Sequence, residues 1–215
     1  VDPLLDALDP RQAALLETWL PDAVIEADMS WGLVETTVLR VRTGGRLVVV
    51  KAAGPGDHHI EREIAAHRRW TGPWVRLGRA ARMLHADVEA KLLVTEYLPG
   101  VLALGSAAES RMDTYAQAGE LLRLYHDQAA VEDAEYEARM NAKALAWFEG
   151  PHRVEPDIVE ELSAMVGSWP RASATCVPTH GDWHCRNWLV DGGVLRVIDF
   201  GRAAVRPAAE DFERL

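Results

Sequence analysis

The stretch that decides the fold of this chain reads THGDWHCRN over residues 179–187 and continues, ten residues later, with VIDFG over residues 197–201. Asn187 comes five residues after Asp182, and Asp199 comes twelve residues after Asn187. Between them, two short apolar runs flank an Asp-Gly-Gly turn, which is typical of a β-hairpin. Because a hairpin brings its outer ends together, we expect Asn187 and Asp199 to face the same point.

An amide oxygen and a carboxylate that meet at one point suit a hard cation such as Mg²⁺, which keeps several waters and takes few protein ligands. Asn187 and Asp199 are therefore the candidate metal ligands. Asp182, just upstream, is placed to orient or deprotonate an attacking hydroxyl and is the candidate catalytic residue. The three side chains together form a set suited to phosphoryl transfer.

The pattern H-G-D-x-H-x-x-N followed by I-D-F-G is similar to the catalytic loop and metal loop of kinases. With His-Gly-Asp at 180–182 in place of His-Arg-Asp, the chain resembles the aminoglycoside phosphotransferase family and its small-molecule kinase relatives, among them choline, homoserine and fructosamine kinases. A single Asp-x4-Asn is common by chance, so the specificity lies in the joint order and spacing.

The resemblance implies an enzyme that moves the γ-phosphoryl group of ATP or GTP to a hydroxyl of a small molecule, with Mg²⁺ as cofactor. An aminoglycoside antibiotic is the leading acceptor on the resemblance alone, and a metabolite such as choline, homoserine or a sugar is the alternative. A nucleotide-binding module without turnover is a third possibility, which the presence of Lys51, Asp182, Asn187 and Asp199 disfavours.

The length and composition are those of a globular protein. The 215 residues suffice for one large domain or two small lobes. A net charge of −10 argues against nucleic-acid binding and is compatible with a cationic acceptor, although a solvated acidic surface accounts for most of the carboxylates. The sequence does not indicate an oligomeric state.

No targeting or membrane segment is visible in the sequence. No apolar run approaches the ~20 residues that a membrane span needs. The start, Val1-Asp2-Pro3-Leu4, lacks a basic region and a cleavage site. Cys176 and Cys185 are too few for a disulfide framework. We therefore expect a cytoplasmic protein with no membrane partner.

The order of predicted elements is that of a two-lobed kinase. We expect an α+β, bilobal, protein-kinase-like fold, with a small N-terminal β-sheet lobe that holds one helix after its third strand and a larger, mainly helical C-terminal lobe. The lobes are predicted over residues 1–96 and 97–215, because Pro99-Gly100 breaks the strand section. Relatives usually continue with several helices after the metal loop, so the C-terminal helices are expected to be missing here.

Periodicity and turn residues predict the individual elements. Pro10 interrupts the first helix and is expected to split or kink it. Asp57 is expected to cap the helix that follows it. The predicted elements are a helix over 4–19, a hairpin from Leu33 and Val34 to Lys51 that turns at 43–45, a helix over 58–70, strands over 80–86 and 91–96, and helices over 110–127, 134–149 and 155–168.

Lys51 is the candidate phosphate-binding lysine. A lysine at a strand end is usually a solvated charge, but the order of strand, lysine, acidic helix, hinge and catalytic loop is that of the family. In the family this lysine contacts the α- and β-phosphates and pairs with a helix glutamate. Glu61 and Glu63 compete for that role, and the Glu-Arg-Glu pattern of the resemblance favours Glu63.

Two more segments are expected to contact the nucleotide. Ser30 and Gly32, in Met-Ser-Trp-Gly, stand where the family's phosphate-covering loop belongs, although a plain turn explains them nearly as well. Glu96, Tyr97 and Leu98 stand at the expected hinge, where an adenine ring needs backbone donors and acceptors in an apolar slot. Tyr97 can equally pack at the lobe interface.

The remaining residues of the catalytic stretch have alternative readings. His180 is structural in the family, and His184 matches a frequent family position of uncertain role. Arg186 replaces a small residue and either contacts a phosphate or forms a salt bridge, of which the second is favoured. Cys176, His180, His184 and Cys185 have zinc-ligand chemistry, but the C-x3-H-x3-H-C spacing lacks the usual paired cysteines and makes zinc the minor alternative.

The segment after the metal loop distinguishes among kinases. Only nine residues separate Gly201 from Asp211, and no A-P-E motif follows. A protein kinase needs a longer activation segment to hold a peptide, so the expected acceptor is a small molecule. Pro207 and Asp211-Phe212 resemble the start of the family's next helix.

Overall fold

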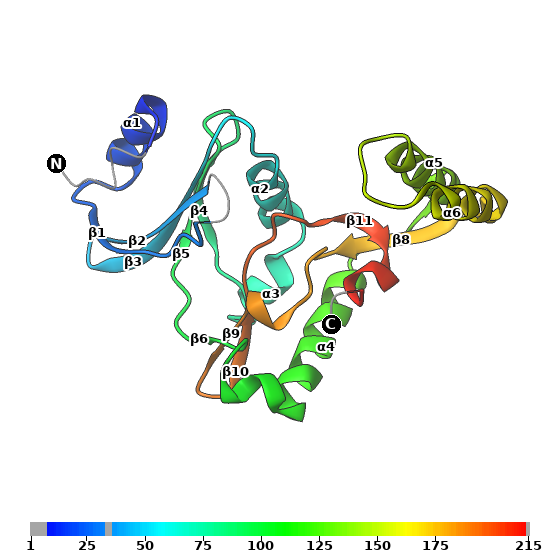
Figure 1. Cartoon of the computed structure of the whole chain (residues 1–215). Helices are drawn as coiled ribbons and strands as arrows, with labels where there is room; N and C mark the ends of the chain where they lie inside the picture. The colour runs from blue at the N-terminus through cyan, green and yellow to red at the C-terminus, as the bar shows by residue number, and fades with distance from the viewer. Residues whose placement is uncertain (1–7, 33–35, 214–215) are drawn as a thin grey trace.

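The computed structural model of the chain describes residues 8–32 and 36–213, and its first half is built on a five-stranded antiparallel sheet (Figure 1). The strand order is β1-β2-β3-β5-β4. The strands are β1 (Val24–Asp28), β2 (Thr36–Thr43), β3 (Arg46–Ala53), β4 (Met83–Asp87) and β5 (Leu92–Glu96).

The β2–β3 hairpin is confirmed at the predicted turn. Thr43 pairs with Arg46, and Gly44 and Gly45 both have positive φ, which a two-residue turn of this kind requires. The predicted start at Leu33 and Val34 lies outside the described residues. The β4–β5 pair is also confirmed. Strand β1 was not predicted, because its five residues have no buried position to reveal a period.

Helices α1 (Pro10–Trp19) and α2 (His59–Arg69) pack on opposite faces of this sheet (Figure 1). Side chains alternate between the faces of a strand. Val50 packs in the cluster that contains the α1 leucines, and Leu93 packs with the isoleucines of α2. Lys51 follows Val50 and pairs with Leu93 across the ladder, which places it on the α2 face.

The first helix is a correction to the sequence analysis. The described helix begins at Pro10 and does not run through it, because a proline fits the first helical turn, where its missing N–H costs no hydrogen bond. Asp9 caps the helix by accepting hydrogen bonds from the N–H groups of Arg11 and Gln12. Residues 4–7 of the predicted helix lie outside the described part of the chain.

Helix α2 is confirmed, together with its predicted cap. Asp57 Oδ1 accepts hydrogen bonds from the N–H groups of His59 at 2.7 Å and Ile60 at 2.9 Å. A second short helix, α3 (Gly72–Arg76), follows α2 and was not predicted. Its Trp74 is fully buried and its ring N–H donates to the Leu121 carbonyl at 2.9 Å.

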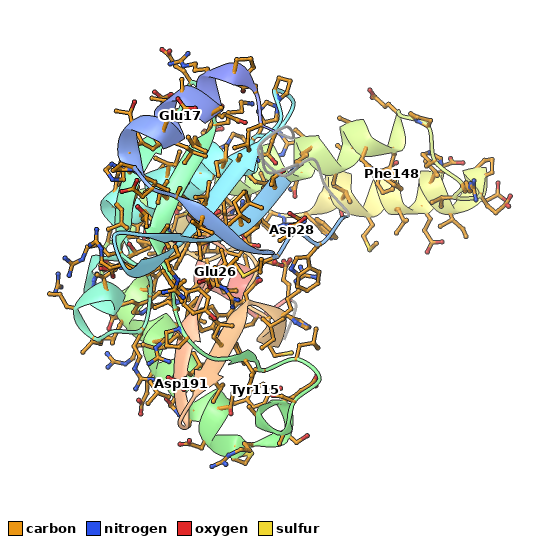
Figure 2. All side chains as sticks on the ribbon, turned by 90° about the vertical axis from the view of Figure 1, so that its left-hand side faces the viewer. Glu17, Glu26, Asp28, Tyr115, Phe148 and Asp191 are labelled. Atoms are coloured by element: carbon orange, nitrogen blue, oxygen red, sulfur yellow. The ribbon has the colours of Figure 1, made fainter. Side chains whose placement is uncertain are left out.

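The three helices predicted in the second half are confirmed within two residues at each end. Helices α5 and α6 form a pair that projects from the body of the molecule (Figure 2). The helices are α4 (Met112–His126), α5 (Tyr136–Phe148) and α6 (Pro156–Ser168).

Two three-stranded sheets accompany these helices. One sheet has the order β10-β9-β6 and contains the predicted hairpin, and the other has the order β11-β8-β7. The strands are β6 (Val101–Leu102), β7 (Val131–Asp133), β8 (Ala174–Thr179), β9 (Trp188–Asp191), β10 (Val194–Val197) and β11 (Ala204–Pro207). Three short 3₁₀ helices are η2 (Ala107–Ser110), η3 (Cys185–Asn187) and η4 (Ala208–Asp211).

An aromatic core joins the two halves. Trp74 of α3 stacks on Tyr125 of α4, with ring centroids 4.5 Å apart, and packs beside Trp183 and Phe200. All four side chains are buried. Because this core includes residues on both sides of residue 96, the lobe boundary placed there stays a prediction. Across the described residues, no helix has the length and apolar content of a membrane span.

Candidate active site

The loop from His180 to Asn187 connects β8 to β9, and its start is fixed by a close backbone contact. Gly181 has a φ of +75°, which favours glycine, and a side chain there would collide with the Arg202 carbonyl oxygen. The loop therefore lies directly against the segment that follows β10. This glycine replaces the arginine of the His-Arg-Asp pattern, and the contact explains why no side chain fits.

A buried carboxylate holds the backbone of this loop. Asp211 of η4 accepts hydrogen bonds from the N–H groups of His180 at 3.1 Å and Gly181 at 2.6 Å. His126 Nε2 lies 2.8 Å from the same carboxylate, which is 1% exposed. In the sequence, Asp211-Phe212 only resembles the start of a helix, and the structure places Asp211 at the end of η4. The local sequence gives no signal of this contact, because Asp211 stands beside Glu210 and the two cannot be told apart without the fold.

His180 is enclosed by the aromatic core. Its Nε2 lies 3.1 Å from the Ile198 carbonyl oxygen, and its ring packs against Trp183 and Phe200. Burial lowers the pKa of His180 below its usual range, so the ring is neutral at neutral pH. A neutral, buried ring tied to the backbone before Asp199 fits a structural role.

Asp182 lies near the start of this loop, where it is buried between an arginine and an amide. Arg186 Nη2 lies 2.6 and 2.8 Å from its two carboxylate oxygens, and Asn187 Nδ2 donates to Oδ2 at 2.8 Å. Burial acts to raise the pKa of Asp182, but the hydrogen bonds from Arg186 and Asn187 outweigh it and hold the pKa below its usual range. The carboxylate is ionised at neutral pH and aimed by two donors.

The β9–β10 hairpin brings the backbone at Asn187 close in space to the backbone just before Asp199. The Ile198 N–H donates to the Asn187 carbonyl at 3.0 Å, directly beyond the paired strands. Asp199 has a φ of +63°, an uncommon conformation for a non-glycine residue that occurs often at functional sites. Its side chain is 52% exposed and therefore open to a ligand.

These two residues have the donor chemistry for Mg²⁺. Asn187 uses its amide nitrogen toward Asp182, which leaves the amide oxygen as its cation-binding atom. Lys51 holds the pKa of Asp199 below its usual range, so Asp199 supplies a charged oxygen. One carboxylate and one amide match a cation that keeps several waters. The meeting of both side chains on one cation stays a prediction.

Lys51 lies between two carboxylates on the α2 face of the sheet. Its Nζ is 2.8 Å from both oxygens of Glu63 and 3.7 Å from Asp199 Oδ1. Although burial acts to lower it, the pKa of Lys51 is raised by Asp199 and Glu63, so the ammonium stays charged. The competing Glu61 lies elsewhere, 3.9 Å from Lys91.

The expected phosphate-covering segment connects β1 to β2. Ser30 Oγ accepts a hydrogen bond from the Val38 N–H at 2.9 Å, and the Ser30 N–H donates to Asp28 at 2.8 Å. These bonds fix the first part of the loop against β2. Gly32 follows with a φ of +66°, and among the described residues no atom lies within 4 Å of the position that a Cβ would take there.

The expected hinge follows β5. The N–H of Glu96 donates to the Arg82 carbonyl and that of Tyr97 to the Leu47 carbonyl. Among the described residues, no hydrogen bond is recorded for the Leu98 N–H, which makes it the available donor of the three. The Tyr97 ring lies under the guanidinium of Arg40, 5.7 Å from its centroid, and so contributes packing.

The zinc alternative is wrong for the part of the chain that the structure describes. No group of three or more His, Cys, Asp or Glu side chains there is placed to hold a metal ion. His184 Nδ1 instead accepts a hydrogen bond from the Arg186 N–H at 3.2 Å and caps η3. Cys176 and Cys185 are both free and buried.

Arginines beside the loop were not recognised as site residues in the sequence. Arg202 lies close enough to Asp182 to lower its pKa further. Arg62 of α2 and Arg206 of β11 line the same hollow as Arg202. Their spacing in the chain carries no motif, so only the folded structure brings them together.

Comparisons with known proteins agree with this geometry. A family model described as "Phosphotransferase enzyme family" matches residues 30–215. No curated protein matches the chain. The aminoglycoside-3′-phosphotransferase of type VIII is a similar solved structure, at 22% identity and a TM-score of 0.60, with 97% of this chain and 81% of that chain covered.

Two further solved structures show similar values. The macrolide 2′-phosphotransferase of Brachybacterium faecium is 17% identical with a TM-score of 0.60, covering 96% of this chain and 76% of that one. A choline/ethanolamine kinase family protein of Mesorhizobium loti is 18% identical with a TM-score of 0.60, covering 98% and 68%. At these identities the similarity shows the fold alone, and it confirms the predicted α+β, kinase-like fold.

Proposed function

The chain belongs to the phosphotransferase enzyme family, and from this premise we propose that it transfers the γ-phosphoryl group of ATP or GTP to a hydroxyl of a small molecule. The observation that carries the proposal is the contact of Lys51 with Glu63 and Asp199. This contact supports a role for Lys51 as the cation that binds phosphate and for Asp199 as the carboxylate that binds the metal. The two lie side by side, next to the loop that holds Asp182 and Asn187. Phosphoryl transfer needs mainly such positioning and charge neutralisation.

Asp182 is the proposed catalytic residue. Its ionised carboxylate orients the acceptor hydroxyl and receives its proton as the bond to phosphorus forms. A carboxylate with a lowered pKa is a weak base, but the transition state of phosphoryl transfer is loose and calls chiefly for orientation. Arg186 and Asn187 aim the carboxylate for this task.

The nucleotide is proposed to lie between the sheet and this loop. Lys51, held by Glu63, contacts the phosphates, while Asn187 and Asp199 hold Mg²⁺, which when bound neutralises developing charge. Ser30 and Gly32 cover the phosphates through their backbone. The Leu98 N–H, in the segment with Glu96 and Tyr97, contacts the adenine ring.

The acceptor is proposed to be a small hydroxylated molecule. The three structures compared above are described as an aminoglycoside phosphotransferase, a macrolide phosphotransferase and a member of the choline/ethanolamine kinase family. An aminoglycoside, whose phosphorylation would confer antibiotic resistance, is the leading acceptor. A metabolite such as choline, homoserine or a sugar is the alternative. The two free cysteines are consistent with a reducing, cytoplasmic location.

The test of the mechanism is the Asp182→Asn variant. We expect its affinity for Mg-ATP to persist while turnover falls on the order of 10²–10⁴-fold, the range typical of a lost general base. Asp191→Asn, the same change at an exposed site at the end of β9, is the matched control and should keep turnover. Near-normal turnover of Asp182→Asn with its true acceptor would exclude the role.

The test of the acceptor class is ADP release against a panel of aminoglycosides, amino alcohols, neutral sugars and generic protein substrates. Activity confined to proteins would overturn the small-molecule proposal. A cationic acceptor held by carboxylates should bind less well at high salt, because exposed charges are screened beyond roughly 10 Å at about 0.1 M ionic strength. Activity confined to neutral sugars would remove the aminoglycoside and keep the phosphotransferase. ADP release with none of these, together with intact Mg-ATP binding, would favour the module without turnover.

A further inference from the structure

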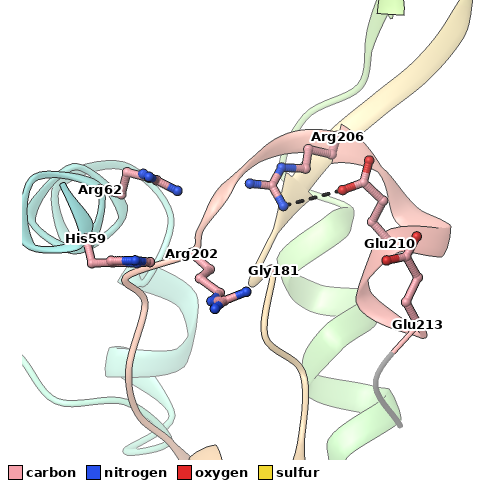
Figure 3. A pocket seen from close by; sticks show the side chains of 7 residues that line it. All are labelled: His59, Arg62, Gly181, Arg202, Arg206, Glu210 and Glu213. Atoms are coloured by element: carbon pink, nitrogen blue, oxygen red, sulfur yellow. Dashed lines mark hydrogen bonds and ion pairs between the residues drawn. The ribbon is translucent and has the colours of Figure 1, made fainter. Parts of the chain in front are cut away.

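A polar hollow of about 250 Å³ lies between α2 and the segment that runs from the metal loop to η4 (Figure 3). Three arginines line it. Arg62 comes from α2, Arg202 from the segment after β10, and Arg206 from β11. The backbone of Gly181 contributes part of the wall, so the hollow adjoins the catalytic loop without containing Asp182.

The three arginines carry more positive charge than their neighbours neutralise. Arg206 pairs with Glu210 at 3.4 Å. Among the described residues, no hydrogen bond or ion pair is recorded for the guanidinium groups of Arg62 and Arg202. Burial lowers the pKa of Arg206, and repulsion from Arg62 and Arg202 adds to this effect, which the attraction of Asp211 and Glu213 does not outweigh. Arg62 and Arg202 are therefore like charges near Arg206 that no hydrogen bond or ion pair within the described residues neutralises, and an anion between the three would relieve their repulsion.

Two carboxylates and a histidine complete the lining. Glu210 and Glu213 lie on the side of the hollow away from α2 (Figure 3). Glu210 is already engaged by Arg206 and by the Tyr136 hydroxyl. His59 turns its Nδ1 to the Gly201 carbonyl at 3.0 Å, which connects α2 to the metal loop. The side facing α2 and Arg202 therefore keeps the uncompensated positive charge.

We propose that Arg62, Arg202 and Arg206 form an anion site that takes a phosphate group, separate from the nucleotide phosphates at Lys51. The planar guanidinium is the side chain best suited to phosphate, because its N–H donors match two phosphate oxygens at once. A water molecule occupies about 30 Å³ in the liquid, so the hollow has room for a phosphate group and its hydration. A bound phosphate would connect α2 to the segment after the metal loop.

The phosphate has two possible sources with the same chemistry. It is either a free phosphate ligand or the phosphate of a phosphorylated acceptor whose hydroxyl reaches Asp182 from the adjoining wall. The anion site itself does not depend on the proposed function, since binding is measured without turnover. The possibility that the phosphate belongs to the acceptor rests on the proposed function and is tested separately.

The test is titration of inorganic phosphate into the full chain by calorimetry at constant ionic strength, with chloride as the replaced anion. We expect saturable binding of one phosphate per chain, with or without Mg-ADP. Arg62→Gln and Arg206→Gln should each weaken it about tenfold or more, since a hydrogen bond to a charged group contributes about 1.5–3 kcal/mol. Arg62→Lys should recover part of the affinity.

Arg68→Gln is the matched control, because Arg68 is an exposed arginine of the same helix that does not line the hollow. It should leave phosphate binding unchanged. Melting temperatures in chloride establish that each variant is folded. Absence of saturable binding, or equal binding by Arg62→Gln, Arg206→Gln and Arg68→Gln, would overturn the anion site.

A second measurement identifies the source of the phosphate. ADP release is compared for sugars and their phosphorylated forms. If the acceptor supplies the phosphate, Arg206→Gln should raise KM for the phosphorylated forms alone, and free phosphate should compete with them. If the phosphate is a separate ligand, free phosphate should raise the melting temperature of the wild type but not that of Arg206→Gln. The KM values of this variant for the sugars and their phosphorylated forms should then equal those of the wild type.

Discussion

The guanidinium of Arg186 contacts both carboxylate oxygens of Asp182, at 2.6 and 2.8 Å, from four residues further along the chain. This contact lies in η3, the short helix that also supplies Asn187. It keeps the carboxylate charged and fixes its orientation. It also places a second positive charge beside the point where phosphoryl transfer is proposed to occur.

Removing Arg186 should change the pH dependence of turnover. In Arg186→Ala, Asp182 loses the hydrogen bonds from Arg186, which lower its pKa and oppose the effect of burial. The pKa of Asp182 should therefore rise. The acid limb of kcat against pH should therefore move to higher pH, because the carboxylate must be ionised to act. Arg186→Lys should shift the limb less. Arg196→Ala, which breaks the exposed pair with Asp191, is the control. An unmoved acid limb in Arg186→Ala would contradict this account.

Replacing Asp199 should abolish Mg²⁺-dependent nucleotide binding. Asp199→Ala removes the charged oxygen proposed to hold the cation, and alanine at positive φ adds roughly 1–2 kcal/mol of strain. Asp199→Asn separates the two effects, because asparagine tolerates this conformation. We therefore expect Asp199→Asn to lose the metal dependence while it keeps the melting temperature. Titration of Mg-ATP measures this, and unchanged affinity with unchanged metal dependence would count decisively against a metal role.

Gly181→Ala should destabilise the catalytic loop by more than its backbone conformation alone accounts for. Gly78 is the control, since it has a similar φ of +66° but open space where a side chain would lie. Gly78→Ala should cost about 1–2 kcal/mol, the strain of the left-handed conformation. Gly181→Ala should cost more, because the new methyl collides with the Arg202 backbone. Urea unfolding measures both, and equal losses would show that the loop can move away.

The stability of the protein should fall as the pH drops below about 6.5, in part because of His67. Burial, with a contribution from Lys51, lowers the pKa of His67 to about 4. Between that value and the unfolded pKa of about 6.5, the unfolded chain binds one more proton than the folded chain. The contribution is therefore fully present above pH 6.5 and lost toward pH 4, by at most about 3.5 kcal/mol at about 1.4 kcal/mol per unit.

The variant that isolates this effect is His67→Gln. Its free energy of unfolding should vary less with pH across this window than that of the wild type, whatever its absolute stability. His58→Gln, at an exposed position just before α2, should retain the wild-type slope. Denaturant unfolding at several pH values provides the comparison, and a slope in His67→Gln equal to that of the wild type would refute the assignment.

The local sequence was sufficient to predict the hairpin, the main helices and the family. Gly192 and Gly193 form a two-residue turn with the apolar runs on either side, and this local pattern sets the spacing from Asn187 to Asp199. The cap at Asp57 and the register of Lys51 likewise follow from neighbours in the chain. Such features could be predicted because turn geometry and strand alternation are decided within a few residues.

Tertiary structure alone decided which distant residues support the site. Asp211 reaches His180 across 31 residues and His126 across 85, and His59 reaches Gly201 across 142. The arginines of the anion site come from three separate segments. No periodic pattern in the sequence predicts these contacts, because each of them depends on how the segment after β10 packs between α2 and α4. The sequence determined which side chains the loop over residues 180–187 carries, while the packing determined its anchor at Asp211 and the arginines beside it.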